Sequence, residues 1–204
     1  MEEKKALLIV DVQNDFCPGG ALAVPEGDKI VPMLNKYMMI FSRKKWPIFA
    51  SRDWHPKESK HFKKFGGPWP EHCIQNTRGA RLHPSLRLPK ETILLSKGMD
   101  PDKDSYSAFQ AVDSKGTGFF ELLKISGIKK LFVGGLATDY CVKSSVLDAL
   151  KFGFRVRLLI DAIKGVNIKP EDSEQAIEEM VRGGAEKMTL EELSEYEKNR
   201  KPRR

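Results

Sequence analysis

The chain lacks any apolar run that approaches the roughly 20 residues needed for a membrane-spanning helix. Its 204 residues include only three cysteines, a small and odd number that argues against a disulfide framework. Its 16 glycines and 12 prolines are too few for a collagen-like or low-complexity chain, and 40% hydrophobic residues exclude disorder of the chain as a whole. What remains is a globular protein whose length suits one domain better than two.

An excess of positive charge is concentrated at the C-terminal end. The formal net charge is +7, and residues 196–204 carry five positive and one negative side chain, which is +4 of that total. We interpret residues 1–195 as the domain and residues 196–204 as a flexible basic tail, with neither nucleic acid nor a membrane as partner. The N-terminus, with Glu2 and Glu3 before a short apolar run, is unlike a signal peptide and predicts a cytoplasmic protein. The sequence does not determine the oligomeric state, and a homo-oligomer is one of the alternatives.

Short apolar runs alternate with helical patterns along the chain. Strands are predicted at residues 6–10, 46–51, 92–96, 131–133 and 154–160, with a short sixth strand at 186–188. Helices are predicted at residues 28–45, 119–125, 139–152 and 173–182. This alternation, with each strand a nearly continuous apolar run, is typical of a parallel sheet covered on both faces. We therefore predict a single doubly wound α/β domain with about six strands, mostly parallel, and helices on both faces.

Four chemically reactive residues follow predicted strands. Asp11, Asp53 and Lys97 come just after the first three strands, and Cys141 lies at the start of the helix after the fourth. The carboxyl ends of parallel strands meet at one edge of the sheet, where ligands bind. Taken singly, each residue also suits a structural role: a cap, a solvated turn or a small core side chain. Together they predict a nucleophilic site at this edge.

The chemistry of such a site follows from the residue types. Amides at a helix start and a nearby Lys97 would favour the Cys141 thiolate, and the same amides could hold an oxyanion. Asp11 could take the thiol proton and pass it to a leaving group. Cys17 and Cys73 lack such neighbours, and we expect them to be structural.

The segment from Asp53 to Pro89 fits neither a helical nor a strand period, and long irregular loops are usually functional. Asp53 and His55 occupy alternate positions of extended chain, so their side chains point the same way. With His61 and His72 they make a donor set suited to Zn²⁺, Mn²⁺ or Fe²⁺, although histidines in a polar surface loop are the alternative. His83 has no such partner and is expected to be structural.

Aromatic residues lie between these groups in the sequence: Phe16 after Asp11, Trp69 before His72, and Tyr106 after Lys97. Their positions in the sequence are equally consistent with packing in the core and with forming the wall of a pocket. As a wall, they would hold a flat aromatic ligand.

With these residues in these positions, the chain resembles a known family, the nicotinamidases (pyrazinamidases) of the isochorismatase-like cysteine hydrolase superfamily. The motifs that carry the resemblance span nearly the whole chain in the expected order: DVQNDFCPGG at 11–20, DWHP at 53–56, WPEHC at 69–73, KG at 97–98 and GLATDYCV at 135–142. The first motif alone would indicate only the superfamily, whereas the set is specific.

The resemblance implies hydrolysis of nicotinamide to nicotinate and ammonia, a step in NAD salvage, and activity on pyrazinamide. It assigns Cys141 as nucleophile, Asp11 as general base and acid, and Lys97 as their charged partner. It also implies a cis peptide between Leu136 and Ala137, with the Ala137 and Cys141 amides as the oxyanion hole.

The resemblance further implies one divalent metal ion, most simply zinc, and no organic cofactor. Asp53, His55 and His72 would hold the metal, which positions the pyridine nitrogen. Many relatives carry a histidine where this chain has Ser59, so His61 is the expected fourth ligand despite its different spacing. The residues expected around the ring are Phe16, Trp69, Leu136 and Tyr106.

Other functions remain as alternatives. A related amidase acting on N-carbamoyl or ureido compounds would keep the Cys141 site but would not need the Asp53 and histidine cluster. A hydrolase using metal-bound water would leave Cys141, Asp11 and Lys97 unexplained. An inactive binding protein would not need all three catalytic positions filled.

Overall fold

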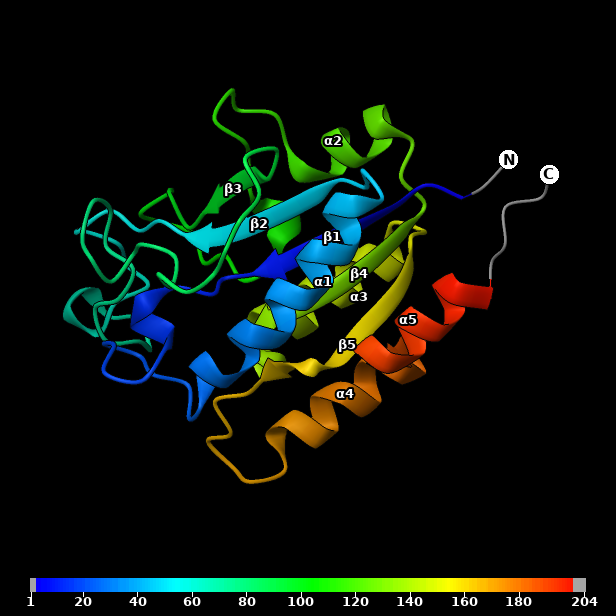
Figure 1. Ribbon diagram of the computed structural model, residues 1–204. Helices are drawn as coiled ribbons and strands as arrows, with labels where there is room; N and C mark the ends of the chain where they lie inside the picture. The colour runs from blue at the N-terminus through cyan, green and yellow to red at the C-terminus, as the bar shows by residue number, and fades with distance from the viewer. Residues whose placement is uncertain (1–2, 200–204) are drawn as a thin grey trace.

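The computed structural model describes residues 3–199 (Figure 1). The strands are β1 (Lys5–Val10), β2 (Ile48–Asp53), β3 (Ile93–Lys97), β4 (Lys130–Leu136), β5 (Arg155–Lys164) and β6 (Glu186–Met188). The helices are α1 (Val31–Arg43), α2 (Phe119–Ser126), α3 (Lys143–Lys151), α4 (Asp172–Arg182) and α5 (Leu190–Asn199). Short 3-10 turns lie at Asn14–Phe16, Gly27–Ile30, Lys63–Phe65 and Ala108–Gln110, and a π-helical turn at Thr138–Val142 leads into α3.

The six strands form one sheet in the order β3-β2-β1-β4-β5-β6, and every pairing is parallel. The predicted fold class is therefore confirmed, with a sheet that is parallel throughout. The chain runs outward from β1 to β3 on one side and from β4 to β6 on the other. The strand order thus reverses between β1 and β4, which is where open parallel sheets bind ligands.

Side chains of β1 divide the apolar core into two layers. Leu7 and Ile9 join one buried cluster, with α1 and Leu193 of α5, whereas Ala6, Leu8 and Val10 join a second, with α2, α3 and α4. The division follows from the alternation of side chains along a strand. All five side chains are fully buried, as expected for a strand covered on both faces.

Several boundaries differ from those predicted. α1 begins at Val31, after a 3-10 turn, and Pro32 stands at its start, where a missing N–H costs nothing. β5 continues to Lys164, beyond an irregularity in its pairing with β4. α5 was not predicted, although Thr189 and Glu192 cap its first turn reciprocally, a signal present in the sequence. It includes Tyr196 and Glu197 of the predicted tail; residues 200–204 of that tail lie outside the described residues.

The irregular segment between β2 and β3 lies at the carboxyl edge of the sheet, where its cyan-to-green trace forms one end of the molecule (Figure 1). Residues just after β1 anchor it. The Asn14 and Asp15 amides donate to the carbonyls of Arg81 and Gly79, and the Asp15 carboxylate accepts from the Cys73 amide at 2.7 Å. This loop is therefore tied to the end of β1, beside Asp11.

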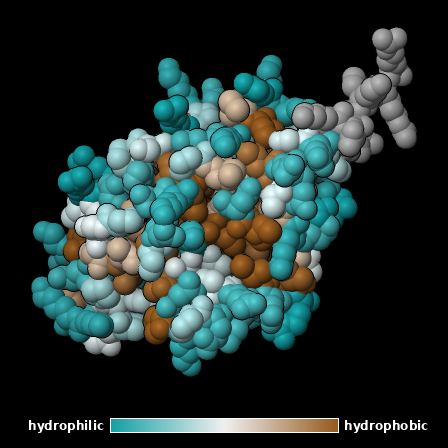
Figure 2. Space-filling model, turned by 60° about the horizontal axis from the view of Figure 1, so that its bottom comes forward, coloured by the Kyte–Doolittle hydropathy of each residue, from teal (hydrophilic) through white to brown (hydrophobic). Residues whose placement is uncertain are grey.

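The surface carries both polar and apolar side chains. Figure 2 shows the underside of the view in Figure 1, where apolar patches lie between hydrophilic side chains. Ile160 of β5 and Val181 of α4 are among the exposed apolar residues. Within residues 3–199, no helix is both long and apolar enough to cross a membrane.

Candidate active site

Asp11, Asp53, Lys97 and Cys141 meet at the carboxyl edge and are all buried. The Lys97 Nζ atom lies 2.9 Å from Asp11 Oδ2 and 3.5 Å from Cys141 Sγ, and it forms an ion pair with Asp53 Oδ1. The four predicted residues therefore form one cluster around a single ammonium group.

The strand register explains this cluster. Asp53 and Lys97 are the last residues of β2 and β3 rather than the residues after them, and they are Cα partners in the sheet. Paired residues on neighbouring parallel strands point to the same face, so the carboxylate and the ammonium meet. Asp11 follows β1 with a φ of 47°, a left-handed conformation that Asp tolerates better than most residues. Its amide donates to the carbonyl of Ser51, and the Ser51 hydroxyl donates to Asp11 Oδ1 at 2.7 Å.

Burial controls the protonation of the cluster. It raises the pKa of the Cys141 thiol well above its ordinary value, and Lys97 offsets only part of this rise. Burial likewise raises the pKa of Asp11. Burial opposes the charge of Lys97, but Asp11, Asp53 and Cys141 together outweigh it and raise the Lys97 pKa. Burial also opposes the charge of Asp53, but Lys97 and His55 together outweigh it and lower the carboxyl pKa. Lys97 thus lowers the thiol pKa, as the sequence suggested, but desolvation, which the sequence-based argument did not include, acts in the opposite direction.

Cys141 lies in the π-helical turn, and the peptide bond between Leu136 and Ala137 is cis, as the resemblance implied. Thr138 and Asp139 are residue types that often cap helices, but neither caps this turn. Ala137 is the residue at the N-cap position, and no side chain caps the turn. The Asp139 carboxylate instead accepts from the amides of Val166 and Asn167, at 2.9 and 2.8 Å. Asp139 thus fastens the loop after β5 against the turn that carries Cys141.

His55, His61 and His72 form a second buried cluster, with ring centroids 4.9 to 5.5 Å apart. Asp53 Oδ2 lies 3.7 Å from His55 Nε2, so Asp53 contacts both clusters. The structure brings His61 to the same place as His55 and His72, despite its different spacing in the sequence. It places His83 elsewhere.

The Nδ1 atom of each of these histidine rings lies within hydrogen-bond distance of an oxygen atom. His55 Nδ1 lies 3.1 Å from Gly98 O, His72 Nδ1 lies 2.7 Å from Pro70 O, and His61 Nδ1 lies 2.6 Å from Asp104 Oδ1. The close approach of Gly98 to the His55 ring needs glycine, because a Cβ there would lie 2.5 Å from Cε1 of the ring.

These residues fit a metal ion. One ligand atom from each of the three histidines lies within 4.8 Å of the others, and burial lowers the pKa of His72 to about 4, which keeps its imidazole neutral. Among the described residues, His55 Nε2 is buried without a hydrogen-bond partner. Imidazole nitrogens with one carboxylate suit a borderline divalent metal such as zinc.

Both clusters adjoin one small pocket. Cys141, His61 and His72 contribute to its wall, and Asp11, Lys97 and His55 are buried behind it. The aromatic side chains on the wall are Phe16, Trp69, Tyr106 and Tyr140. The Trp69 indole donates to the Tyr106 hydroxyl at 2.9 Å, which joins two walls of the pocket.

Some residues depart from the sequence-based picture. Leu136 is fully buried in the core and is not among the described residues that line the pocket. Tyr140, beside Cys141 in the predicted motif, does line it and was not singled out. Ser51 and Gln13 were also missed; the Gln13 amide bonds to both the N–H and the carbonyl of Asp53. The only sequence signal for Ser51 was a hydroxyl two residues before Asp53, at the end of the predicted strand.

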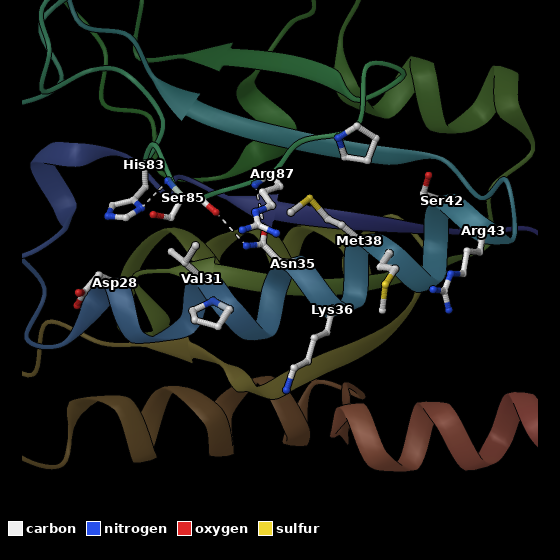
Figure 3. Close-up of a pocket in the computed structure, with 13 residues that line it drawn as sticks. Asp28, Val31, Asn35, Lys36, Met38, Ser42, Arg43, His83, Ser85 and Arg87 are labelled. Carbon is white, nitrogen blue, oxygen red and sulfur yellow. Dashed lines mark hydrogen bonds between the residues drawn. The ribbon is translucent and has the colours of Figure 1, made fainter.

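A second hollow lies along α1, between this helix and residues 83–89 (Figure 3). Asn35 joins its walls, since its side chain donates to Ser85 O and accepts from Arg87 N, both at 2.9 Å. His83 lines this hollow, and among the described residues none of the predicted catalytic or metal-binding side chains does. The candidate active site is therefore the smaller pocket at the carboxyl edge.

The fold and site define a doubly wound α/β protein with a buried Asp–Lys–Cys cluster beside a histidine cluster. Residues 5–192 match the isochorismatase domain, and the chain belongs to the isochorismatase family. It is 42% identical to the nicotinamidase of Escherichia coli, over 94% of this chain and 97% of that protein.

Solved structures agree in fold. The pyrazinamidase of Pyrococcus horikoshii, solved in complex with zinc, is 48% identical with a TM-score of 0.85, covering 92% of this chain and 99% of that one. A protein from L. infantum solved with nicotinate is 34% identical with a TM-score of 0.81, covering 92% of this chain and 93% of that one. The family resemblance inferred from the motifs is confirmed.

Proposed function

We propose that this protein is a nicotinamidase, which hydrolyses nicotinamide to nicotinate and ammonia through a thioester on Cys141. One observation carries the proposal: Cys141 lines the same aromatic-walled pocket as His61 and His72. A thiol nucleophile and a metal site facing one small aromatic pocket suit a ring that carries both a carboxamide and a basic nitrogen.

The residues of the pocket wall would bind the substrate. Phe16, Trp69 and Tyr106 would enclose the flat ring by stacking and edge contacts. Asp53, His55, His61 and His72 would hold the metal, for which we propose zinc, in keeping with the zinc complex of the Pyrococcus protein. When bound, the metal would supply an electrophilic anchor for the pyridine nitrogen and so orient the carboxamide toward Cys141.

Proton transfer begins at Asp11. Because burial raises the pKa of the Cys141 thiol, Asp11 would accept its proton before or during the attack of sulfur on the carboxamide carbon. Lys97 contacts both groups and stabilises the negative charge as it passes between them. The amides of Ala137 and Cys141 would hold the oxyanion of the tetrahedral intermediate.

Collapse of that intermediate breaks the carbon–nitrogen bond, and Asp11 returns its proton to the departing ammonia. Water then attacks the thioester carbon while Asp11 accepts a proton from it. When the carbon–sulfur bond breaks, the Cys141 sulfur leaves as thiolate and recovers the proton from Asp11. The nicotinic acid so formed gives its carboxyl proton to solvent or to the released ammonia and leaves as nicotinate, and the residues regain their initial protonation states.

The direct test is ammonia release from nicotinamide by the zinc-loaded protein, before and after treatment with a chelator. We expect rapid release that falls when the metal is removed, with the larger effect on KM because the metal orients the ring. Release from N-carbamoyl or ureido amides but not from nicotinamide would reject the proposed substrate and favour the related amidases.

Replacing Ser51 with alanine is expected to reduce the fraction of Asp11 that is ionised and able to act as a base at a given pH. The Ser51 hydroxyl bonds to the ionised form of Asp11 and lowers its pKa, so Ser51→Ala raises that pKa. Since the base must be ionised, the acidic limb of the pH profile of kcat/KM should move to higher pH, and kcat at neutral pH should fall about tenfold, the effect of one hydrogen bond to a charged group. Ser51→Thr keeps the hydroxyl and should restore the profile. An unshifted limb in Ser51→Ala would contradict the role of this hydrogen bond.

A further inference from the structure

Three successive residues of the loop after β3 contact three different parts of the site. Asp104 Oδ1 lies 2.6 Å from His61 Nδ1, the Ser105 carbonyl accepts from Lys97 Nζ at 3.2 Å, and the Tyr106 hydroxyl accepts from the Trp69 indole at 2.9 Å. The side chain of Gln110 holds this stretch in place, since its Oε1 accepts from the amides of Tyr106 and Ser107, both at 3.0 Å. The position of the Asp104 carboxylate is therefore set by the same short segment that contacts Lys97.

We propose that Asp104 is a positioning residue for the metal site, whose carboxylate orients the His61 ring so that Nε2 serves as a metal ligand. The inference rests on the proposed metal site and deepens it. A carboxylate that accepts from Nδ1–H fixes the tautomer in which Nε2 carries the free lone pair. It also makes that lone pair more basic, which strengthens a bond to a metal.

His61 differs from its two neighbours in the kind of acceptor it contacts. His55 and His72 are oriented by backbone carbonyls, those of Gly98 and Pro70. His61 contacts a side-chain carboxylate, a stronger acceptor because it is charged. The His61 side chain is 4% exposed, whereas that of Asp104 is 57% exposed, so the carboxylate reaches the buried ring from the solvent side. A substitution at Asp104 thus alters the ring's partner without opening the core.

The same loop offers a matched control. Asp102 forms an ion pair with Lys60 at 2.7 Å, and the Lys60 amide donates to Pro101 O at 2.8 Å. This contact joins the same two loops, one residue before His61, but it does not touch an imidazole. Loss of Asp102 therefore tests whether loop attachment alone would account for an effect of Asp104.

The experiment measures zinc affinity by titrating zinc-loaded protein with a chromophoric chelator. We expect Asp104→Asn to weaken zinc binding by about 10- to 100-fold, the usual cost of losing an outer carboxylate partner of a metal-binding histidine. Asp102→Asn should stay within about twofold of the wild type, since exposed ion pairs contribute little. Asp104→Ala should match or exceed the loss in Asp104→Asn, and Asp104→Glu should recover part of it.

A double-mutant cycle separates orientation of His61 from other effects. In a His61→Ala background, Asp104→Asn should cause no further loss of zinc affinity, because the ring that it orients is gone. Cobalt-substituted protein should show an altered visible spectrum in Asp104→Asn but not in Asp102→Asn. Zinc affinity within twofold of wild type in Asp104→Asn, an equal loss in Asp102→Asn, or an undiminished effect in the His61→Ala background would each overturn the proposal.

These readouts do not depend on turnover of nicotinamide. If zinc affinity falls as expected while nicotinamide is not hydrolysed, the inference about Asp104 stands and the proposed substrate fails. If nicotinamide is hydrolysed while Asp104→Asn binds zinc normally, the proposed function stands and the inference about Asp104 fails.

Discussion

Cys141→Ala is expected to reduce kcat for ammonia release by at least about 10⁴-fold, because removing a covalent nucleophile eliminates the acyl-enzyme route. Among the described residues, Cys141 is the only thiol on the pocket wall, so no second cysteine can replace it. The change removes one sulfur atom from a small buried side chain and leaves the histidine cluster untouched. Zinc content should therefore remain at the wild-type level, and initial rates of ammonia release with parallel metal analysis check both expectations.

Cys17→Ala is the matched control for this experiment. Cys17 is also buried, but it is not among the described residues that line the pocket, and burial raises the pKa of its thiol to about 11. Its replacement should leave kcat within a few-fold of the wild type. Retention of more than about a tenth of the activity by Cys141→Ala would refute the thioester mechanism, and a large loss in Cys17→Ala would show that the assay responds to packing rather than to chemistry.

Lys97→Met is expected to abolish activity and to lower the free energy of unfolding by about 3–5 kcal/mol at neutral pH. The ammonium of Lys97 forms ion pairs with both Asp11 and Asp53, and all three side chains are almost completely inaccessible to solvent. Methionine fills a similar volume, so the effect comes from two uncompensated carboxylates rather than from a cavity. Urea denaturation of both proteins measures the difference.

The pH dependence of this difference has a definite sign. Lys97 lowers the folded-state pKa of Asp53, so its contribution is present above the unfolded pKa of about 3.9 and is lost as the pH falls through the folded value. In Lys97→Met the carboxyls take up protons more readily, so the stability gap should narrow as the solution is acidified. A gap below about 1 kcal/mol at neutral pH would mean that the cluster is not held together by Lys97.

Lys60→Met supplies the control for stability. Lys60 pairs with Asp102, and both side chains are more than half exposed, 69% and 62%. Because water already solvates these charges, the substitution should change the free energy of unfolding by less than about 1 kcal/mol. The contrast between the two lysines tests whether burial explains why the ion pairs of Lys97 contribute more to the free energy of unfolding than that of Lys60.

The fold could be predicted closely because its signals are local. Each strand reads as an apolar run, as at residues 6–10, and α2 and α3 end near Gly127 and Gly153, both with positive φ. Boundaries were less accurate where tertiary contacts extend an element. β5 is longer than its apolar run because it continues to pair with β4 past an irregularity, and α5 is polar over most of its surface, so only its capping residues marked it.

The location of the site could also be predicted from the sequence, since reactive side chains at the ends of parallel strands must gather at one edge. Asp11, Lys97 and Cys141 were predicted in this way and the histidines from the irregular loop after Asp53, and the structure brings these side chains together. Leu136 was placed on the pocket wall but lies in the core, while Tyr140 and Ser51 were missed. Which side chains face the pocket depends on the backbone conformation of each turn. Neither the spacing of residues nor their type determines that conformation.

The sequence by itself determined the parallel α/β layering, the family and the residue types available for chemistry, because periodicity and motif order are properties of the chain. The tertiary structure alone decided how these residues interact. The register of β2 against β3 puts Lys97 between two carboxylates, and desolvation raises the pKa of the Cys141 thiol. The folding of a separate loop brings Asp104 to His61. Distance and burial set these interactions, and both arise only when segments far apart in the chain are packed together.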